Sequence, residues 1–303
     1  MKIIFMGTPD FAVPILEALS KKYEIALVVS QPNRAKKKGV EVLTPVAQFA
    51  KNNNLPLFQP EHIKDDNAPI MESDADMMVT AAYGQYIPSF ILNKFKHAIN
   101  VHGSLLPRHR GGAPIQRSLM QGDLKTGVTI MSMTKKLDAG LIYAMKEYVI
   151  KEDDNSSTVF NELSLIGRDL LLDVIDDIYN DKNLGIEQDE ALATYSPNIL
   201  PAEEEIHLDN NTKDIINQIR GLAMNPGAYL LVNDIKIKVY KASKVEDNSN
   251  LKPGTVINTK KCIVLKTKDA AISLDLVLMP GKKIISGKDF SNGQKIFITG
   301  EVI

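Results

Sequence analysis

The chain has 303 residues, of which 44% are hydrophobic and 24% are charged. These values are those of an ordinary soluble globular protein with two domains or one large one. No run of 18 apolar residues occurs, so no transmembrane helix is indicated. Cys262 is the only cysteine, which excludes an internal disulfide and a cysteine-based zinc site.

The N-terminal segment reads MKIIFMGTPDFAVP. Its apolar run is short and breaks at Gly7-Thr8-Pro9, whereas a signal peptide has a basic start, a longer apolar stretch and a small-residue cleavage site. The segment therefore predicts a first strand and a turn. Together with the single cysteine, it leads us to expect a cytoplasmic location.

The net charge of −1 hides an asymmetry between the two ends of the chain. Residues 206–303 hold 14 lysines and 1 arginine against 9 acidic residues, a net charge of +6, and residues 1–205 have a net charge of −7. This asymmetry suggests that the C-terminal part meets a polyanion. A lysine-rich, solubilising surface on a small β domain explains it equally well.

The first part of the chain predicts strands that alternate with helices, because short apolar runs are followed by segments with helical spacing. In chain order we expect a strand at 2–6, a helix at 11–22, strands at 25–30 and 76–82 with a helix at 45–53 between them, a short helix near 88–95, and a strand at 98–107 that runs into a loop. The polar, basic segment 31–45 predicts a long loop.

The next part predicts a helix at 113–121 and then two alternating segments, 127–136 and 141–150. These two segments flank Leu137-Asp138-Ala139-Gly140, so we expect them to form an antiparallel pair. The longest amphipathic helix is expected at 158–180. The fold class is therefore α/β, with a doubly wound, mostly parallel sheet of Rossmann-like type.

The pattern changes after about residue 185. Residues 188–205 are acidic and contain two prolines, which predicts a linker between a first domain at 1–187 and a second at 206–303. The second domain has an expected helix at 214–222, followed by short β runs that turns separate. This pattern predicts a small OB-like β-barrel.

The densest chemical signal is the stretch from Asn100 to Pro114, NVHGSLLPRHRGGAP. Asn100 and His102 are two apart in an extended segment, so their side chains share a face near the end of a strand, where open α/β sheets bind ligands. Asn supplies an uncharged donor for a developing oxyanion, and His moves a proton near neutral pH. Asp138, at the bend between two strands, is a candidate to orient His102.

Each of these residues also has a purely structural explanation. His102 alone fits a core or capping histidine, and Asp138-Ala139-Gly140 alone fits a turn. A turn-rich loop with scarce arginines favours a ligand site, because three of only 6 arginines fall at Arg108, Arg110 and Arg117. Arg108 and Arg110 fit carboxylate or phosphate binding and loop bracing equally well, and His109 is expected to be exposed to solvent.

Several motifs together resemble the folate-dependent formyltransferase family over nearly the whole chain. They are FMGTPDFAVP (5–14), QPNR (31–34), TAAYGQYIP (80–88), INVHGSLLPRHRGGAPIQRSL (99–119), GVTIMSMTKKLDAG (127–140), QIRGL (218–222), KVYKA (238–242), PGTV (253–256) and PGKK (280–283). The Asn-x-His, SLLP and Asp motifs are specific to the family as a whole. Three of these stretches, FMGTPDFAVP, QPNR and the GAPIQRSL part of the stretch at 99–119, resemble the members that act on methionyl-tRNA.

The resemblance implies a role for each matching residue. Asn100, His102 and Asp138 match the catalytic trio, and Ser104, Leu105, Leu106 and Pro107 match the tetrahydrofolate-binding segment. Arg34, Lys36, Lys37 and Lys38 match a basic loop that approaches the tRNA acceptor end. This loop usually reads QPDRPxGRG and here reads QPNRAKKKG, and a Pro-Trp-Pro-like stretch after QIRGL is absent.

The function that the resemblance implies is transfer of the formyl group of 10-formyltetrahydrofolate to methionyl-initiator tRNA, with the domain at 206–303 binding tRNA. We expect a monomer with no metal and no membrane partner. The alternatives are a formyltransferase for an amino-sugar nucleotide, an inactive tRNA-binding protein and a nicotinamide-dependent oxidoreductase. The absence of a G-x-G-x-x-G fingerprint disfavours the last of these.

Overall fold

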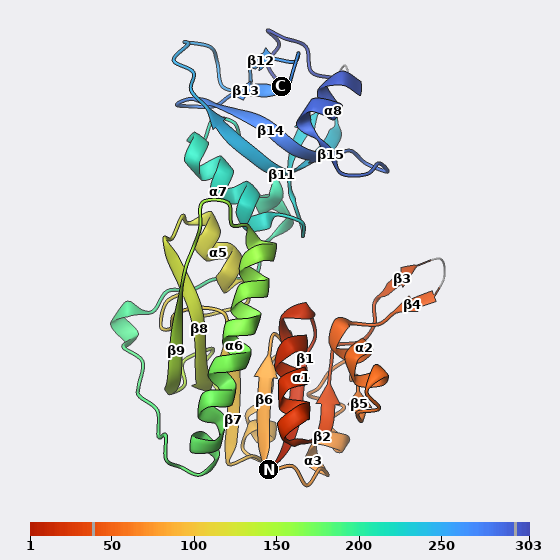
Figure 1. Cartoon of the computed structure of the whole chain (residues 1–303), viewed down its shortest axis with the longest axis vertical. Helices are drawn as coiled ribbons and strands as arrows, with labels where there is room; N and C mark the ends of the chain where they lie inside the picture. The colour runs from red at the N-terminus through yellow and green to blue at the C-terminus, as the bar shows by residue number, and fades with distance from the viewer. Residues whose placement is uncertain (38–39, 294–295) are drawn as a thin grey trace. The chain divides into compact units, whose positions relative to one another are not determined.

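The computed structural model describes the backbone of residues 1–37, 40–293 and 296–303, and their side chains except those of 35–37 and 40. The chain divides into two compact units (Figure 1). The N-terminal unit comprises residues 1–114, 125–149 and 160–197. The C-terminal unit comprises residues 115–124, 150–159 and 198–303.

The N-terminal unit is built on a seven-stranded sheet with the order β5-β2-β1-β6-β7-β8-β9. The first five strands in this order are parallel, and β8 and β9 add antiparallel edges, as the alternating segments predict. The strands are β1 (Lys2–Gly7), β2 (Glu24–Val29), β5 (Leu57–Phe58), β6 (Met77–Ala81), β7 (His97–His102), β8 (Lys125–Ser132) and β9 (Ile142–Val149). The predicted doubly wound, mostly parallel sheet is confirmed.

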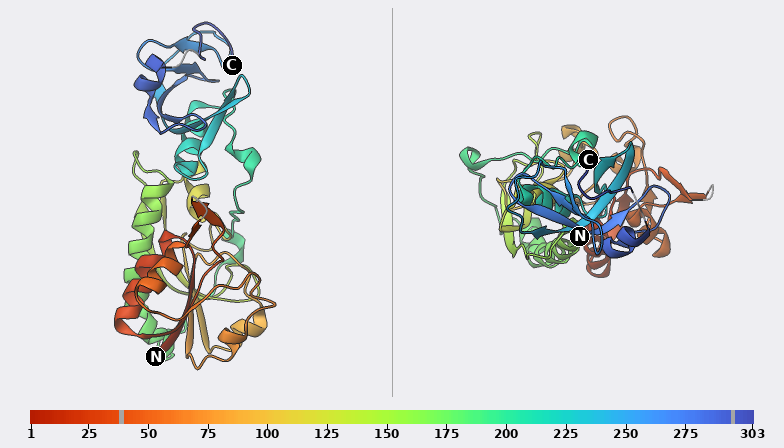
Figure 2. Two further views of the ribbon diagram at one scale, coloured as in Figure 1. Left: turned by 90° about the vertical axis from the view of Figure 1, so that its right-hand side faces the viewer. Right: turned by 90° about the horizontal axis from the view of Figure 1, so that it is seen from above.

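Helices cover both faces of this sheet (Figure 2). On one face, Gly167 of α6 lies against Val101 of β7 and Val128 of β8. On the other face, Ile70 of α3 and Ile91 of α4 share a buried cluster with strand residues. The helices up to this point are η1 (Asp10–Ala12), α1 (Val13–Lys22), α2 (Pro45–Asn52), α3 (Ala68–Met71), α4 (Ser89–Leu92), α5 (Pro114–Met120) and α6 (Ser156–Tyr179).

The segment 31–45 differs from the predicted long loop. Strands β3 (Ala35–Lys37) and β4 (Val40–Val42) form a two-stranded antiparallel ribbon within it, and Figure 1 shows this ribbon extending away from the sheet of the N-terminal unit. The sequence Val40-Glu41-Val42 alternates a β-branched residue with a polar one, a pattern that suits a strand. The polar, basic composition of the segment predicts a loop, and an alternation over only three residues does not change that prediction.

The C-terminal unit is an antiparallel sheet with the order β10-β11-β14-β13-β12 and with β15 paired to β14, which confirms the OB-like barrel class. Its core gathers residues from the strands and from helices α7 and α8, including Ile219, Ile237 and Phe290. The elements are α7 (Thr212–Leu222), β10 (Ala228–Val232), β11 (Ile235–Val245), β12 (Val256–Asn258), β13 (Val264–Lys266), β14 (Ala271–Leu278), β15 (Ile285–Ser286) and α8 (Gly287–Gly293).

The segment predicted as a linker, 188–205, has defined structure. It contains two short 3-10 helices, η2 (Glu190–Leu192) and η3 (Pro201–Glu204). Its residues up to Pro197 belong to the N-terminal unit, and the rest belong to the C-terminal unit. Its acidic residues pair with arginines, since Glu190 binds Arg110 in the first unit and Glu203 binds Arg117 in the second.

No helix in the described part of the chain combines the length and the apolar character needed to cross a lipid bilayer.

Candidate active site

Asn100 and His102 lie at the C-terminal end of β7, on the same face of the sheet. Their neighbour Val101 points to the opposite face, where it packs against α6. The parallel pairing of β6 and β7 sets Thr80 beside Asn100, and the Thr80 hydroxyl donates to Oδ1 of Asn100 over 2.8 Å. Since Oδ1 accepts this bond, the amide nitrogen of Asn100 is the end that is left to donate.

His102 is buried and its ring is fixed by a backbone carbonyl. Its Nε2 lies 2.9 Å from the carbonyl oxygen of His109. A carbonyl can only accept, so Nε2 carries the proton and donates it. In the neutral ring Nδ1 is then the acceptor, and it lies 3.8 Å from Oδ2 of Asp138. This separation is too long for a direct hydrogen bond, but one water molecule or substrate atom between Nδ1 and Oδ2 can interact with both.

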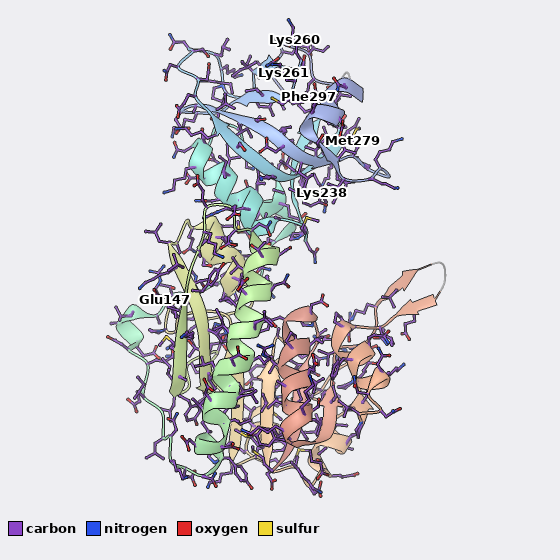
Figure 3. All side chains as sticks on the ribbon, viewed as in Figure 1. Glu147, Lys238, Lys260, Lys261, Met279 and Phe297 are labelled. Atoms are coloured by element: carbon purple, nitrogen blue, oxygen red, sulfur yellow. The ribbon has the colours of Figure 1, made fainter. Side chains whose placement is uncertain are left out.

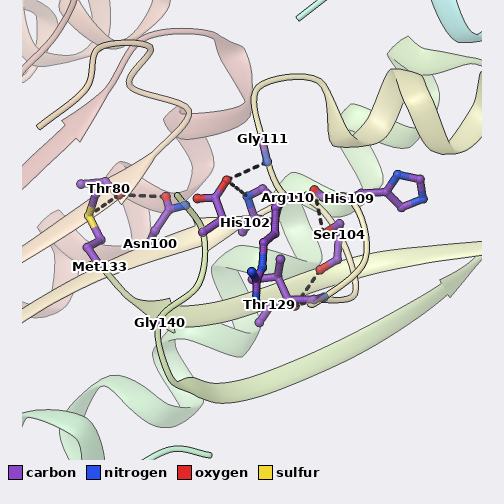
Figure 4. A network of polar contacts seen from close by, with 12 residues as sticks. Thr80, Asn100, His102, Ser104, His109, Arg110, Gly111, Thr129, Met133 and Gly140 are labelled. Carbon is purple, nitrogen blue, oxygen red and sulfur yellow. Dashed lines mark hydrogen bonds and ion pairs between the residues drawn. The ribbon is translucent and has the colours of Figure 1, made fainter. Parts of the chain in front are cut away.

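Asp138 stands in the bend between β8 and β9, where its backbone adopts the left-handed conformation with φ of 46°. The amide of Gly111 donates to its Oδ2 over 2.8 Å. Figure 4 shows Thr80 and Asn100 on one side of His102, and Ser104 and His109 on the other. The structure thus brings Asn100, His102 and Asp138 together from residues up to 38 positions apart.

The segment predicted to bind folate, 104–107, forms the first turn of the loop after β7. The Ser104 hydroxyl is fully buried and donates to the carbonyl of Arg108 over 2.7 Å, and Thr129 donates to the carbonyl of Ser104. Leu106 is buried with Met131 and Ile142, while Leu105 and Pro107 are half-buried. Ser104 and Leu106 therefore hold the loop in shape.

His109 and Arg110 are buried, which corrects the prediction of a solvent-exposed His109. Nδ1 of His109 lies 2.8 Å from the Ser196 hydroxyl, and the guanidinium of Arg110 bonds Gln188 and Glu190. Arg110 thus braces the loop. Arg108 and Arg117 take different positions, since Arg108 is exposed and Arg117 pairs with Glu203.

Arg110 and Glu190 form an ion pair in which Nη2 of Arg110 lies 3.0 Å from Oε1 of Glu190. Burial lowers the pKa of Arg110, but the hydrogen bond and charge of Glu190, together with those of Tyr195, outweigh this effect and raise that pKa. Arg110, followed by Lys136, lowers the pKa of Glu190 to about 2. Gln188 and Glu190 are not among the predicted site residues, because the acidic, proline-containing sequence of their segment predicts a linker.

The predicted tRNA contacts lie on or beside the β3–β4 ribbon. Arg34 is exposed, and its guanidinium lies 3.5 Å from a carboxylate oxygen of Glu61. Lys36 and Lys37 lie in β3, and their side chains are not among those described. Lys38 lies outside the described residues.

The lysines of the C-terminal unit do not all share one face. Residues 237, 239 and 242 of β11 point into the core, so Lys236, Lys238 and Lys241 point outward. A bulge near Tyr240 shifts the alternation by one residue, and this shift places Lys241 on the outer face. Figure 3 shows Lys260 and Lys261 near β12 and Lys238 on β11. Lys266 differs from these lysines, because it is buried and binds Asp247 over 2.8 Å.

A doubly wound sheet that presents an amide donor, a histidine and a carboxylate at a strand end has the elements of a group-transfer enzyme acting at a carbonyl. The family model "Formyl transferase" matches residues 1–175, and "Formyl transferase, C-terminal domain" matches residues 198–295. The chain belongs to the formyl transferase family.

The similar proteins include methionyl-tRNA formyltransferases from several bacteria. The one from Lactobacillus acidophilus is 42% identical over 99% of this chain and 98% of its own length. The one from Streptococcus sanguinis is 43% identical over 97% of this chain and 96% of its own length. The likeness therefore extends through both units.

Solved structures with the same fold include HypX from Aquifex aeolicus in complex with tetrahydrofolic acid, with a TM-score of 0.67 and 16% identity. It covers 96% of this chain, which spans 46% of HypX. An N-formyltransferase from Helicobacter canadensis in complex with folinic acid and dTDP-3-aminofucose has a TM-score of 0.69 and 17% identity, and covers 90% of this chain and 98% of its own length. At these identities the likeness establishes the fold alone.

Proposed function

We propose that the protein transfers the formyl group of 10-formyltetrahydrofolate to the free amino group of methionyl-initiator tRNA, and so supports translation initiation. The observation that carries this proposal is the full-length identity of 40 to 43% to methionyl-tRNA formyltransferases. The family relationship gives the formyl chemistry, and the positively charged C-terminal part suits an RNA substrate.

Asn100 is the residue that we assign to the oxyanion. Attack of an amine on a formyl carbon places negative charge on the formyl oxygen, and a fixed amide donor stabilises that charge. The Thr80 hydroxyl orients the Asn100 amide so that its nitrogen donates. Because this orientation exists before the substrate binds, no rearrangement is needed as the charge develops.

His102 and Asp138 are the residues that we assign to proton movement. The amine loses a proton as it attacks, and the nitrogen that leaves must gain one. Nδ1 of His102 and Oδ2 of Asp138 face one another across 3.8 Å and both accept protons. A proton passes between substrate and leaving nitrogen through this pair or through one water between them.

The loop 104–107 is proposed to bind the folate with its backbone and with the half-buried Leu105 and Pro107, since the side chains of Ser104 and Leu106 are used internally. Arg34, Lys36, Lys37 and Lys38 are proposed to attract the tRNA backbone. The exposed lysines of β11 extend that attraction, because lysine and arginine supply most of the affinity for phosphates.

The test is transfer of labelled formyl from 10-formyltetrahydrofolate to charged initiator methionyl-tRNA by the wild type and by His102→Ala. We expect transfer by the wild type and a loss of at least about 100-fold in the variant, since a positioned proton-transfer group contributes roughly that much. Circular dichroism of both proteins controls for folding.

No transfer to methionyl-tRNA by folded wild type contradicts the proposed substrate. The same folate donor is then offered with amino-sugar nucleotides, and transfer to these would move the protein to the sugar-modifying members of the family. Equal rates for wild type and His102→Ala would remove His102 from the reaction and leave the substrate assignment in place.

A further inference from the structure

The backbone at Asp138 lies in the left-handed region, with φ of 46°. Few residues other than glycine, asparagine and aspartate adopt this conformation, and a non-glycine residue keeps it where its surroundings hold the backbone. Two residues on, Gly140 lies so close to β8 that an added Cβ would stand 1.9 Å from the carbonyl oxygen of Ser132. The bend is therefore confined on the β8 side.

Gln188 confines the bend on its other side. Its side-chain amide nitrogen donates to the carbonyl of Asp138 over 2.9 Å and to the carbonyl of Gly140 over 2.8 Å. Its side-chain oxygen accepts from Nε and Nη2 of Arg110 over 3.0 and 2.8 Å. All the donor and acceptor positions of the amide are thus used, which allows only one orientation of the group.

Arg110 connects this bend to the loop after β7. Its side chain is fully buried, and its guanidinium also bonds Glu190, two residues beyond Gln188. Its backbone pairs with the same segment, because the Arg110 amide donates to the carbonyl of Thr194 and the Ser196 amide donates to the carbonyl of Arg110. The neighbouring carbonyl of His109 accepts from His102, and the neighbouring amide of Gly111 donates to Asp138.

The anchoring segment, residues 188–196, therefore contacts Asp138 directly and is linked to His102 through the loop residues His109 and Arg110. Through Gln188 it holds the backbone of Asp138, and through Arg110 it holds the two loop groups that bind His102 and the Asp138 carboxylate. We propose that Gln188, oriented by Arg110, is a positioning residue that fixes Asp138 relative to His102 during formyl transfer. This role rests on the proposed function of Asp138 and His102.

The test compares Gln188→Glu with wild type in the methionyl-tRNA assay. The substituted carboxylate keeps the size of the side chain and the acceptor oxygens that face Arg110, but it cannot donate to the carbonyls of Asp138 and Gly140. We expect kcat to fall about 10- to 100-fold, because a small misplacement of a reacting group has an effect of that size. We also expect a displaced pH profile of kcat, and KM values for folate and tRNA that change less than about threefold.

Glu187→Gln is the matched control, because Glu187 is the preceding residue and is exposed. It removes an acidic group where Gln188→Glu adds one, and it should keep both kcat and the pH profile of the wild type. Gln188→Ala is the second variant, and it should lose kcat similarly without adding a charge. Urea unfolding of all variants separates lost stability from lost rate.

The outcomes separate the two proposals. If the wild type formylates methionyl-tRNA and Gln188→Glu has the same kcat and pH profile as Glu187→Gln, the role of Gln188 is overturned. The proposed function is unaffected by that result. A fall in activity that follows lost stability, with an unchanged pH profile of kcat, also overturns the role of Gln188. Folded wild type that does not formylate methionyl-tRNA overturns the proposed function and, with it, this role.

Discussion

The loop after β7 and the β3–β4 ribbon are both proposed to bind substrate, but the contacts around them differ. The loop between His102 and Ala113 buries His109 and Arg110 and bonds residues from Gln188 to Ser196. Arg34, at the base of the ribbon, is exposed and has an ion pair 3.5 Å long. Proton transfer needs atoms placed to within fractions of an ångström, whereas attraction of a polyanion needs only charge within reach.

Among the changes that test this comparison, Gly111→Ala is expected to have the largest effect, and it tests how rigid the loop must be. Gly111 has φ of 120°, and an added Cβ would stand 2.7 Å from the carbonyl oxygen of Ser196. The loop must shift away from the anchoring segment, and the bond from the Gly111 amide to Asp138 moves with it. We expect a fall in kcat of about 10- to 100-fold and a loss of stability of about 1–3 kcal/mol, measured by transfer assays and urea unfolding.

Gly281→Ala is the matched control for Gly111→Ala. Gly281 also has a positive φ, of 70°, but an added Cβ meets no described atom within 4 Å. Its substitution should show the backbone cost without the clash and without a change in kcat. Equal activity of the two variants would mean that the loop tolerates movement. The loop would then need no more exact placement than the ribbon does.

A smaller effect is expected from pH, acting through Glu190. Its carboxyl has a pKa of about 2 in the folded protein against an ordinary value of 4.5, chiefly because Arg110 binds it. As pH falls below about 4.5 the unfolded chain takes up the proton first, so the stability that this pair contributes is present above that pH and is lost toward pH 2.

The measurement is the melting temperature of wild type and Glu190→Gln between pH 7 and pH 3. The wild type should melt higher at pH 7, and the difference should shrink as pH approaches 3. Glu187→Gln should follow the wild type at every pH. A difference that is constant with pH would show that Glu190 contributes through its shape and not through its charge.

The sequence indicated which side chains of the candidate site lie close together, but not the contacts that hold them in place. The spacing of Asn100 and His102 fixes a shared face in any strand, and Asp138 stands out at a bend between two alternating segments. Gln188 gave no such signal, because a side chain that binds two backbone carbonyls needs no periodic pattern. The acidic and proline-containing character of its segment predicted a linker, whereas the glutamates there pair with buried or half-buried arginines.

The fold, too, could be predicted from the sequence only in part. Hydrophobic periodicity placed the long helices and the buried strands, because burial of one face imposes it. The β3–β4 ribbon was not predicted, because strands of three residues are too short to show a periodic hydrophobic pattern. On β11 the bulge near Tyr240 changes which residues face outward, so simple alternation accounts for Lys236 and Lys238 but not for Lys241.

The smallest effect is expected from removing charge at the ribbon, with Arg34→Ala combined with Lys36→Ala. If these residues attract phosphates, KM for tRNA should rise about 2- to 10-fold with kcat unchanged, and the slope of affinity against salt should fall by up to about 1 for each side chain. Lys64→Ala combined with Lys182→Ala removes the same charge from exposed positions elsewhere in the N-terminal unit and should change neither quantity. A fall in kcat in the ribbon variant would show that the ribbon also places the substrate, and the two regions would then differ in degree and not in kind.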